Sequence, residues 1–456
     1  MRRVEIVALA SVTALLAVAG CGSLNGSVHT SLTAWPSFTG TPVREGAAIY
    51  VSGIGATGKR SVWLSESWIT RGHSHSGLFE SDGAGASWHQ VFGWDGWPFW
   101  QRHFDSSHAL VLAEFEERDY RLHPRLLSTR DGGVHWSAGD LPVTSIYGWS
   151  GLSVDFVDPD NGWLMVDLSG QFGRCVKAKQ GVAIYRTRDG GASWVEIARV
   201  DQQHPDAQGL SIDGGKAGLS FRNGLDGYLT TSDPINGNTV FFTEDAGASW
   251  KRQTLPIDAG RGTAWISPPD WIGTEVGLMS VKISPPTMEP CLLGSPSPEP
   301  PQSSPSPHPW DVEPPASIVV PYPGEVLLAT QNGGRAWSVM PASSSWGSVD
   351  SLAAADEVDW AVASSSDLWK TADGGSTWQV NRSVLQSGCD FGVIGFADRL
   401  NAWASALCTK PGPVIQGCPQ QGDYASEWDC PPLSLPLLST HDGGSTWTET
   451  DKPALN

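Results

Sequence analysis

The stretch TRDGGASW, residues 187–194, decides the fold because the chain carries seven copies of this pattern. Each copy has a Ser or Thr, an acid or Asn close behind it, one or more Gly, and a Trp at its end. The other copies are SDGAGASW ending at Trp88, TRDGGVHW at Trp136, TEDAGASW at Trp250, TQNGGRAW at Trp337, TADGGSTW at Trp378 and THDGGSTW at Trp447. Such recurrence along one chain is typical of a repeat architecture.

The residue types within each copy predict a tight hairpin turn. A carboxylate such as that of Asp189 can accept hydrogen bonds from the backbone of its own turn, and the following Gly tolerates positive φ. The Trp ring then packs under the turn while the chain returns as a strand. We therefore predict structural, not catalytic, roles at both positions. The acid position is assigned to Asp82, Asp131, Asp189, Asp245, Asn332, Asp373 and Asp442, and the Trp position to Trp88, Trp136, Trp194, Trp250, Trp337, Trp378 and Trp447.

Short β-rich runs fill the intervals between the copies, as SVDFVD and GWLMVD do before the third copy. The shortest interval, from Asn332 to Asp373, is 41 residues, which is the length of one propeller blade. The predicted fold is thus all-β: a seven-bladed β-propeller of four-stranded antiparallel blades, with one copy in the turn between the third and fourth strands (C and D) of each blade. An open, solenoid-like array is the alternative.

The repeated pattern resembles the Asp-box, or bacterial neuraminidase repeat, of sialidases, sortilin-type receptors and photosystem II assembly factors. The resemblance spans residues 82–447. In repeat pattern the chain is most similar to the photosystem II assembly and stability factors, which resemble it in having one seven-bladed propeller. That resemblance implies the fold and a non-catalytic scaffold, but not the partner, because this chain differs in its inserts and cysteines.

The N-terminus predicts export. Residues 1–20 contain Arg2, Arg3 and an apolar run, which is typical of a secretory signal peptide. The sequence Val-Ala-Gly-Cys ending at Cys21 resembles a bacterial lipobox, which implies lipidation of Cys21 and an extracytoplasmic protein anchored to the cell membrane. A secreted protein is the alternative. Residues 21–45, rich in Ser, Thr, Gly and Pro, predict a flexible linker, and residues 46–456 the propeller.

Charge and cysteine content restrict the partners. A formal charge of −19 without a basic run argues against nucleic acid. Besides Cys21 there are six cysteines that an exported protein can pair in disulfides, in any of fifteen combinations. They are Cys175, Cys291, Cys389, Cys408, Cys418 and Cys430. Their irregular spacing does not favour a metal site, and we predict neither a metal nor a cofactor; the His73 and His75 pair has no evident acidic partner.

Excess length beyond the bare repeat unit indicates a functional face. It falls in connections between the second and third strands, near residues 168–184, 284–324 and 409–434, which lie opposite the repeated turns in a propeller. The Pro- and Ser-rich insertion 284–324 is interpreted as filler, with a lid as the alternative. Aromatic residues on the same face are candidate ligand-binding residues, with packing between blades as the alternative: Trp94, Trp97, Trp100 and Trp149.

Enzyme hypotheses find little support in the sequence. Sialidases resemble one another in an Arg-Ile-Pro motif and a Tyr nucleophile; the motif is missing, and Tyr147, Tyr228 and Tyr322 match no pattern. Xyloglucanases with this repeat hold their acids between two propellers, whereas seven copies supply one. Acids on the insertion-bearing face are indistinguishable from surface charge: Asp95, Glu116, Glu117 and Asp119. The leading hypothesis is a non-catalytic scaffold that binds a protein, peptide or glycan; the alternative is a glycan-cleaving hydrolase.

Overall fold

The computed structural model describes residues 27–29, 33–34, 49–58, 61–70, 73–116, 122–143, 151–168, 180–232, 238–260, 262–284, 317–320, 324–340, 349–382, 384–385, 388–408, 436–451 and 453. Every regular element in these segments is a β-strand. Accordingly, this part of the chain has no helix with the length and apolar character needed to span a membrane.

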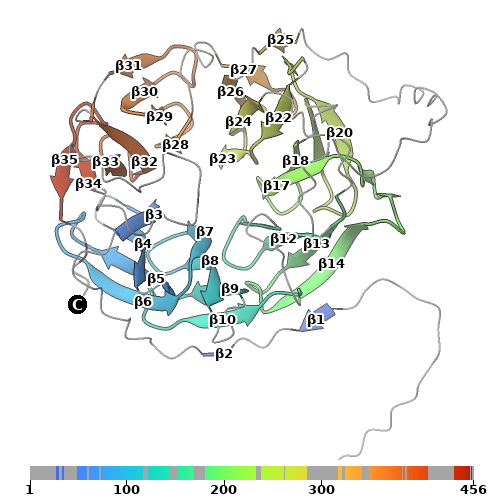
Figure 1. Ribbon diagram of the computed structural model, residues 1–456, viewed down its shortest axis with the longest axis horizontal. Helices are drawn as coiled ribbons and strands as arrows, with labels where there is room; N and C mark the ends of the chain where they lie inside the picture. The colour runs from blue at the N-terminus through green and yellow to red at the C-terminus, as the bar shows by residue number, and fades with distance from the viewer. Residues whose placement is uncertain are drawn as a thin grey trace, which may run out of the picture.

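Seven antiparallel sheets stand in a ring around a central axis (Figure 1). Each blade uses four consecutive strands, A to D, except that strand A of blade 5 is split between β22 and β23. Blade 1 has β3 (Ile49–Ala56), β4 (Val62–Thr70), β5 (His73–Ser81) and β6 (His89–Asp95); blade 2 has β7 (Pro98–His103), β8 (Ala109–Glu116), β9 (Leu122–Thr129) and β10 (Ser137–Asp140); blade 3 has β11 (Leu152–Phe156), β12 (Gly162–Asp167), β13 (Val182–Thr187) and β14 (Ser193–Val200).

The remaining blades follow the same order. Blade 4 has β17 (Gly215–Phe221), β18 (Gly227–Ser232), β19 (Thr239–Thr243) and β20 (Lys251–Thr254); blade 5 has β22 (Thr263–Ile266), β23 (Asp270–Ile272), β24 (Val276–Ser284), β26 (Gly324–Thr330) and β27 (Ser338–Val339). Blade 6 has β28 (Ser351–Ala354), β29 (Trp360–Ser364), β30 (Asp367–Thr371) and β31 (Gln379–Asn381); blade 7 has β32 (Cys389–Phe396), β33 (Ala402–Cys408), β34 (Leu437–Thr440) and β35 (Thr448–Thr450). The predicted seven-bladed, all-β propeller is confirmed, with each repeated turn joining strands C and D.

Short additional strands lie outside this plan. Strand β1 (Ser27–His29) pairs with the outer strand of blade 3, and β2 (Thr33–Ala34) with that of blade 2. Both belong to the segment 21–45 for which the sequence predicts a flexible linker; these five residues are instead paired, because an outer strand offers unused backbone donors and acceptors. The other pairs are β15 (Asp206–Ala207) with β16 (Leu210–Ser211), and β21 (Ile257–Asp258) with β25 (Ile318–Val319).

The face that carries the repeated turns, called here the box face, also carries the turns between strands A and B. Several of these turns share a second pattern, in which an Asp or Asn accepts hydrogen bonds from the backbone two and three residues later. Asp158 does so from Asp160 and Asn161. The A–B turn then accepts a hydrogen bond from the repeated turn of its own blade, as Asp160 O does from Gly190 N at 2.9 Å. Equivalent hydrogen bonds join the two turns at the ends of blades 2 to 7.

Apolar side chains fill the spaces between neighbouring blades. Between blades 3 and 4 the rings of Trp163 and Phe221 stack with centroids 3.7 Å apart and planes 6° apart, and Ile184, Leu219 and Phe241 surround them. All five side chains are almost fully buried. Since no blade can cover its own two faces, burial of this kind between blades stabilises the ring.

The ring closes without a shared strand. Blade 1 is built from residues 49–95 and blade 7 from residues 389–450, so neither borrows a strand from the other. Instead Trp88 Nε1 donates a 2.9 Å hydrogen bond to Asp451 O, and Leu64 and Phe79 of blade 1 pack against Leu437 of blade 7.

Candidate functional site

The repeated turns are held by a dense internal network. In blade 3, Asp189 Oδ1 accepts hydrogen bonds from Thr187 Oγ1 and Ser193 N, both at 2.8 Å, while Thr187 Oγ1 accepts one from Gly191 N at 2.9 Å. Gly190 and Gly191 have φ of 71° and 89°, values that Gly adopts without strain. The carboxylate is therefore committed to its own turn.

The same bonds control the protonation of these acids. In blade 7 the Thr446 hydroxyl and backbone N–H groups lower the pKa of Asp442 to about 2. In blade 6 the Thr377 hydroxyl and N–H lower the pKa of Asp373. Hydrogen bonds to the charged form stabilise it, so both turns hold carboxylates at neutral pH.

The first copy departs from the sequence assignment. Ser81 Oγ accepts hydrogen bonds from Gly83 N at 3.3 Å and Gly85 N at 2.9 Å, as Thr187 does from Asp189 N and Gly191 N. Gly83 therefore stands at the acid position, and Asp82, which was assigned to it, is an exposed residue one place earlier. The assignment of Asp82 was wrong because Asp82 follows Ser81 directly, whereas the acid position lies two residues after the Ser or Thr.

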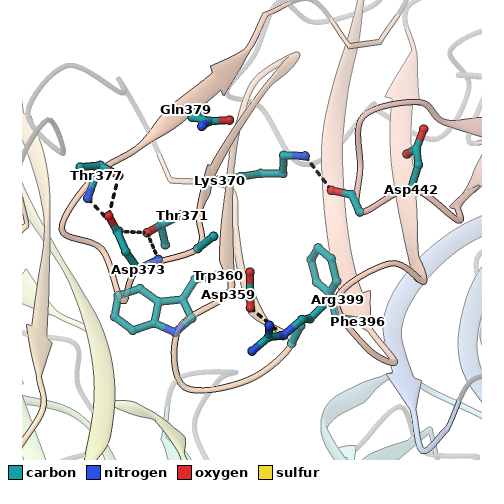
Figure 2. Close-up of a pocket in the computed structure, with 13 residues that line it drawn as sticks. Asp359, Trp360, Lys370, Thr371, Asp373, Thr377, Gln379, Phe396, Arg399 and Asp442 are labelled. Carbon is teal, nitrogen blue, oxygen red and sulfur yellow. Dashed lines mark hydrogen bonds and ion pairs between the residues drawn. The ribbon is translucent and has the colours of Figure 1, made fainter.

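A pocket of about 310 Å³ opens on the box face between blades 6 and 7 (Figure 2). Its lining comes from the A–B turns and repeated turns of both blades: Ala355, Asp359, Trp360, Lys370, Thr371, Ala372, Asp373, Thr377, Gln379, Phe396, Arg399, Asp442 and Gly443. The volume suits a single side chain or a small ring system. This is the face opposite the insertions from which the sequence predicts the binding face; those insertions lie mostly outside the described residues, so that prediction is untested.

Two cations border the pocket and tie the blades together. Lys370 Nζ donates to Gly443 O at 2.9 Å and to Ser445 Oγ at 3.3 Å, both on blade 7. The Nε of Arg399 of blade 7 is 2.6 Å from Asp356 of blade 6. The same Nε is 2.8 Å from Asp359 of blade 6 (Figure 2). Within the described residues these contacts use two of the three ammonium N–H groups of Lys370, so one is available to a further acceptor.

Local sequence explains why Trp360 and Phe396 form the apolar part. In blades 3, 4 and 7 an aromatic residue ends strand A and a small residue opposite begins strand B, as with Phe396 and Ala402. Blade 6 reverses this order, since Ala354 ends strand A and Trp360 begins strand B. Trp360 packs toward blade 5, where it lies beside Met340, and Phe396 is left half-buried at the pocket.

A second polar cluster crosses the inner strands of blades 2 to 5. Arg102 Nη1 is 2.8 Å from Asp155 Oδ1, and Asp155 Oδ2 accepts a 2.7 Å hydrogen bond from Phe221 N. Burial raises the pKa of Asp155, which Arg102 opposes. The side chain of Asp270, at the start of β23, is exposed, yet desolvation by the surrounding protein together with the Asp155 charge raises its pKa to about 6. A group with that pKa can donate or accept a proton near neutral pH.

The four candidate binding tryptophans do not form one exposed platform. Trp94 is 2 % exposed and packs against Phe92 and Phe115, so it fills the space between blades and cannot bind a ligand as proposed. Trp97 is half-buried, and Trp100 packs against Phe156 at the core of blades 2 and 3. Trp149 lies outside the described residues. Spacing alone could not separate an exposed aromatic from one packed between blades.

His75 has an acidic partner that the sequence did not reveal. Its Nδ1 lies 2.6 Å from Asp95 Oδ1 because both residues face each other across strands β5 and β6. His73 is exposed, and no group of three or more metal-ligating residues occurs in the described segments. Of the other candidate acids, Glu116 ends strand β8, while Glu117 and Asp119 lie outside the described residues.

Of the candidate tyrosines and cysteines, only some lie within the described residues. Tyr228 is buried, donates a 2.8 Å hydrogen bond to Gly334 O and has its pKa raised by burial, which is unsuitable for a nucleophile. Tyr147 and Tyr322 are outside the described residues. Cys389 and Cys408 form a disulfide between strands β32 and β33. The other cysteines, Cys21, Cys175, Cys291, Cys418 and Cys430, are outside the described segments.

The tryptophans at the ends of the repeated turns differ in burial from blade to blade. Trp136, Trp194, Trp250 and Trp337 are buried, whereas Trp88, Trp378 and Trp447 are half-buried. The indole N–H of several of them, including Trp136, donates to the carbonyl of the second small residue of its turn, Gly133 O at 3.1 Å in that copy. The pocket residues Lys370 and Arg399 were not predicted, although the repeated D-x-x-N/D pattern of the A–B turns was a signal for the turn that carries Arg399.

No protein-family model matches the sequence, and no curated protein matches it. Several solved structures are similar to the chain: YCF48 bound to D1 peptide is 14% identical, with 82% of this chain and 94% of that chain covered and a TM-score of 0.43. The GH74 xyloglucanase from Xanthomonas campestris is 14% identical over 90% and 70%, with a TM-score of 0.43. The phage phi92 endosialidase is 10% identical over 94% and 70%, with a TM-score of 0.38.

Proposed function

We propose that the chain is an exported propeller that binds a protein, peptide or glycan partner without chemical turnover. The signal-like residues 1–20 and the lipobox-like sequence before Cys21 support export and lipid anchoring. In six of the seven repeats a Thr hydroxyl bonds to the Asp or Asn side chain of its own turn, which supports assignment to the Asp-box propellers.

The observation that carries the proposal is the pocket between blades 6 and 7. It joins the half-buried ring of Phe396 to hydrogen-bonding groups of Lys370, Gln379 and Arg399. Its carboxylates at Asp373 and Asp442 are already satisfied by their turns, which suits recognition rather than proton transfer. A concave site with an apolar part and a few oriented polar groups is the usual form of a binding site.

A binding screen with the full chain tests this proposal. Peptide and glycan arrays are probed with the wild type and with the double variant Lys370→Met, Arg399→Met, while product formation is followed by mass spectrometry. We expect a retained ligand, no product and at least tenfold weaker binding in the double variant. The control Arg382→Met changes an exposed Arg of blade 6 that is not part of the pocket. Cleavage of an arrayed glycan, or equal binding by all variants, would contradict the proposal.

The second candidate function is a glycan-cleaving hydrolase centred on the inner-strand cluster. Asp270, with a pKa raised to about 6 beside the Asp155 carboxylate, has the property expected of a general acid. An Asp270→Asn variant would abolish glycan cleavage if this function holds, whereas Asp206→Asn, an exposed acid in the β15–β16 hairpin, would not. Absence of cleavage by the wild type, or equal cleavage by Asp270→Asn, eliminates this candidate.

A further inference from the structure

One position of strand B differs in size from blade to blade and points toward the next blade. In every blade this strand B residue pairs with the strand C residue that comes just before the Ser or Thr of the repeated turn. The shared pairing shows that the seven strand B residues occupy equivalent positions. From blade 1 to blade 7 the residues are Trp63, Leu110, Trp163, Tyr228, Leu278, Ala361 and Trp403. Ala361 of blade 6 is the smallest. It is buried and does not itself line the pocket, but it faces blade 7, and its cross-strand neighbour Lys370 is a lining residue.

The blade 3–4 interface shows what fills this space when a Trp is present. The Trp163 ring stacks on Phe221, and its Nε1 donates to Ala246 O at 2.9 Å. The Arg186 guanidinium carbon lies 5.2 Å from the same ring. Thus an aromatic ring, a cation and a carbonyl oxygen enclose the indole.

The same three partners recur around the pocket. Phe396 ends strand A as Phe221 does, Lys370 lies opposite Ala361 as Arg186 lies opposite Trp163, and Gly443 follows its turn acid as Ala246 does. All three of these blade 6–7 residues line the pocket. The pocket therefore keeps three of the groups that enclose the Trp163 indole, beside a strand position that carries Ala361 instead of a Trp.

We propose that this pocket receives an aromatic side chain of the partner, with indole preferred. The inference rests on the proposed binding function and names the chemistry of the ligand. Phe396 supplies a ring to stack on, and Lys370 supplies a cation for the ring face. Carboxylates at Asp359, Asp373 and Asp442 offset the two cations of the pocket, which favours a neutral ring over an anion.

Calorimetry with free indole, N-acetyl-tryptophanamide and cyclohexanol tests the proposal on the full chain. We expect one site per chain for both indoles and at least tenfold weaker binding of cyclohexanol. Ala361→Trp should remove indole binding, and Ala361→Leu, which copies the residue of blades 2 and 5, should weaken it at least tenfold even where the larger substitution does not fold. Val134→Trp adds an indole to an exposed turn tip of the box face and should bind as the wild type does. Unchanged binding by Ala361→Leu would overturn the proposal, as would equal binding of cyclohexanol.

A second variant examines the template itself. Trp163→Ala removes the indole from the blade 3–4 interface and should raise the number of indole sites from one to two. If it remains at one, the equivalence of the two interfaces is wrong. If the chain binds a peptide or glycan on the arrays and free indole does not displace that ligand, this inference is overturned but the binding function is not. Indole binding without any retained partner would overturn the binding function but not the pocket's preference.

Discussion

Blades 3 and 4 meet over a buried tryptophan, whereas blades 6 and 7 meet over an alanine and leave a pocket. The backbone registers are the same in both places, since Trp163 pairs with Arg186 as Ala361 pairs with Lys370. A repeat scaffold can thus form a pocket where one ring is replaced by a small side chain, while the pairing of the strands stays the same. Such a site inherits ready-made surroundings from the interface that it replaces.

The largest effect is expected from opening the filled interface. Trp163→Ala should cost about 3–5 kcal/mol in stability, because it removes a fully buried ring and leaves a cavity. Thermal unfolding measures the loss, with Trp265→Ala as the control because that ring is 47% exposed. Similar losses for the two variants would mean that Trp163 does not hold blades 3 and 4 together.

Removal of the disulfide should have the second largest effect on stability. This disulfide lies in blade 7, on one side of the interface that contains the pocket. It links Cys389 and Cys408 across strands β32 and β33, with a sequence separation of 19. A disulfide that closes a loop of that length lowers the conformational entropy of the unfolded chain and so stabilises the folded state by about 3 kcal/mol. The variant Cys389→Ser, Cys408→Ser should therefore show faster amide hydrogen exchange in β32 and β33 but not in β17 and β18 of blade 4. Faster exchange in both blades would refute a local role.

The fold followed from sequence more fully than the site did. Seven copies of one turn and strand-rich intervals were enough for blade number, strand number and turn position, because each blade repeats the same local chemistry. The pocket instead depends on how Ala361 is placed in three dimensions. Its importance can be recognised only once the structure shows that Lys370 lies opposite it and that Phe396 of the next blade lines the same pocket. Trp94 failed as a binding residue for the same reason, since burial between blades is set by the neighbouring blade.

Acid should weaken the turns that border the pocket. The pKa of Asp442 is lowered to about 2, below the value of about 4 in an unfolded chain. The unfolded state therefore binds more protons in this interval, so the contribution of Asp442 is present above pH 4 and lost as the pH falls toward 2. Asp442→Asn should cost about 1 kcal/mol at pH 7 and little at pH 2. Thermal unfolding at both pH values is the measurement, and Asp82→Asn, which changes a residue outside the acid position, should be nearly neutral at both.

The smallest difference separates the two equivalent cations. Arg186 donates to Gly224 O at 3.1 Å and lies over the Trp163 ring, whereas the partners of Lys370 among the described residues are a carbonyl and a hydroxyl. Arg186→Met should therefore cost about 0.5–1 kcal/mol more than Lys370→Met in thermal unfolding. In the background of Ala361→Trp that difference should shrink, because Lys370 then gains a ring; an unchanged difference would contradict the equivalence.

The closure of the ring sets an order for folding during synthesis. Leu64 and Phe79 of blade 1 obtain their apolar neighbour Leu437 only after more than three hundred further residues have been made. Until then one flank of blade 1 is an uncovered apolar surface, and surfaces of that kind recruit chaperones or other chains. The seam between the first and last blades is thus the part of the molecule whose completion is delayed longest on the ribosome.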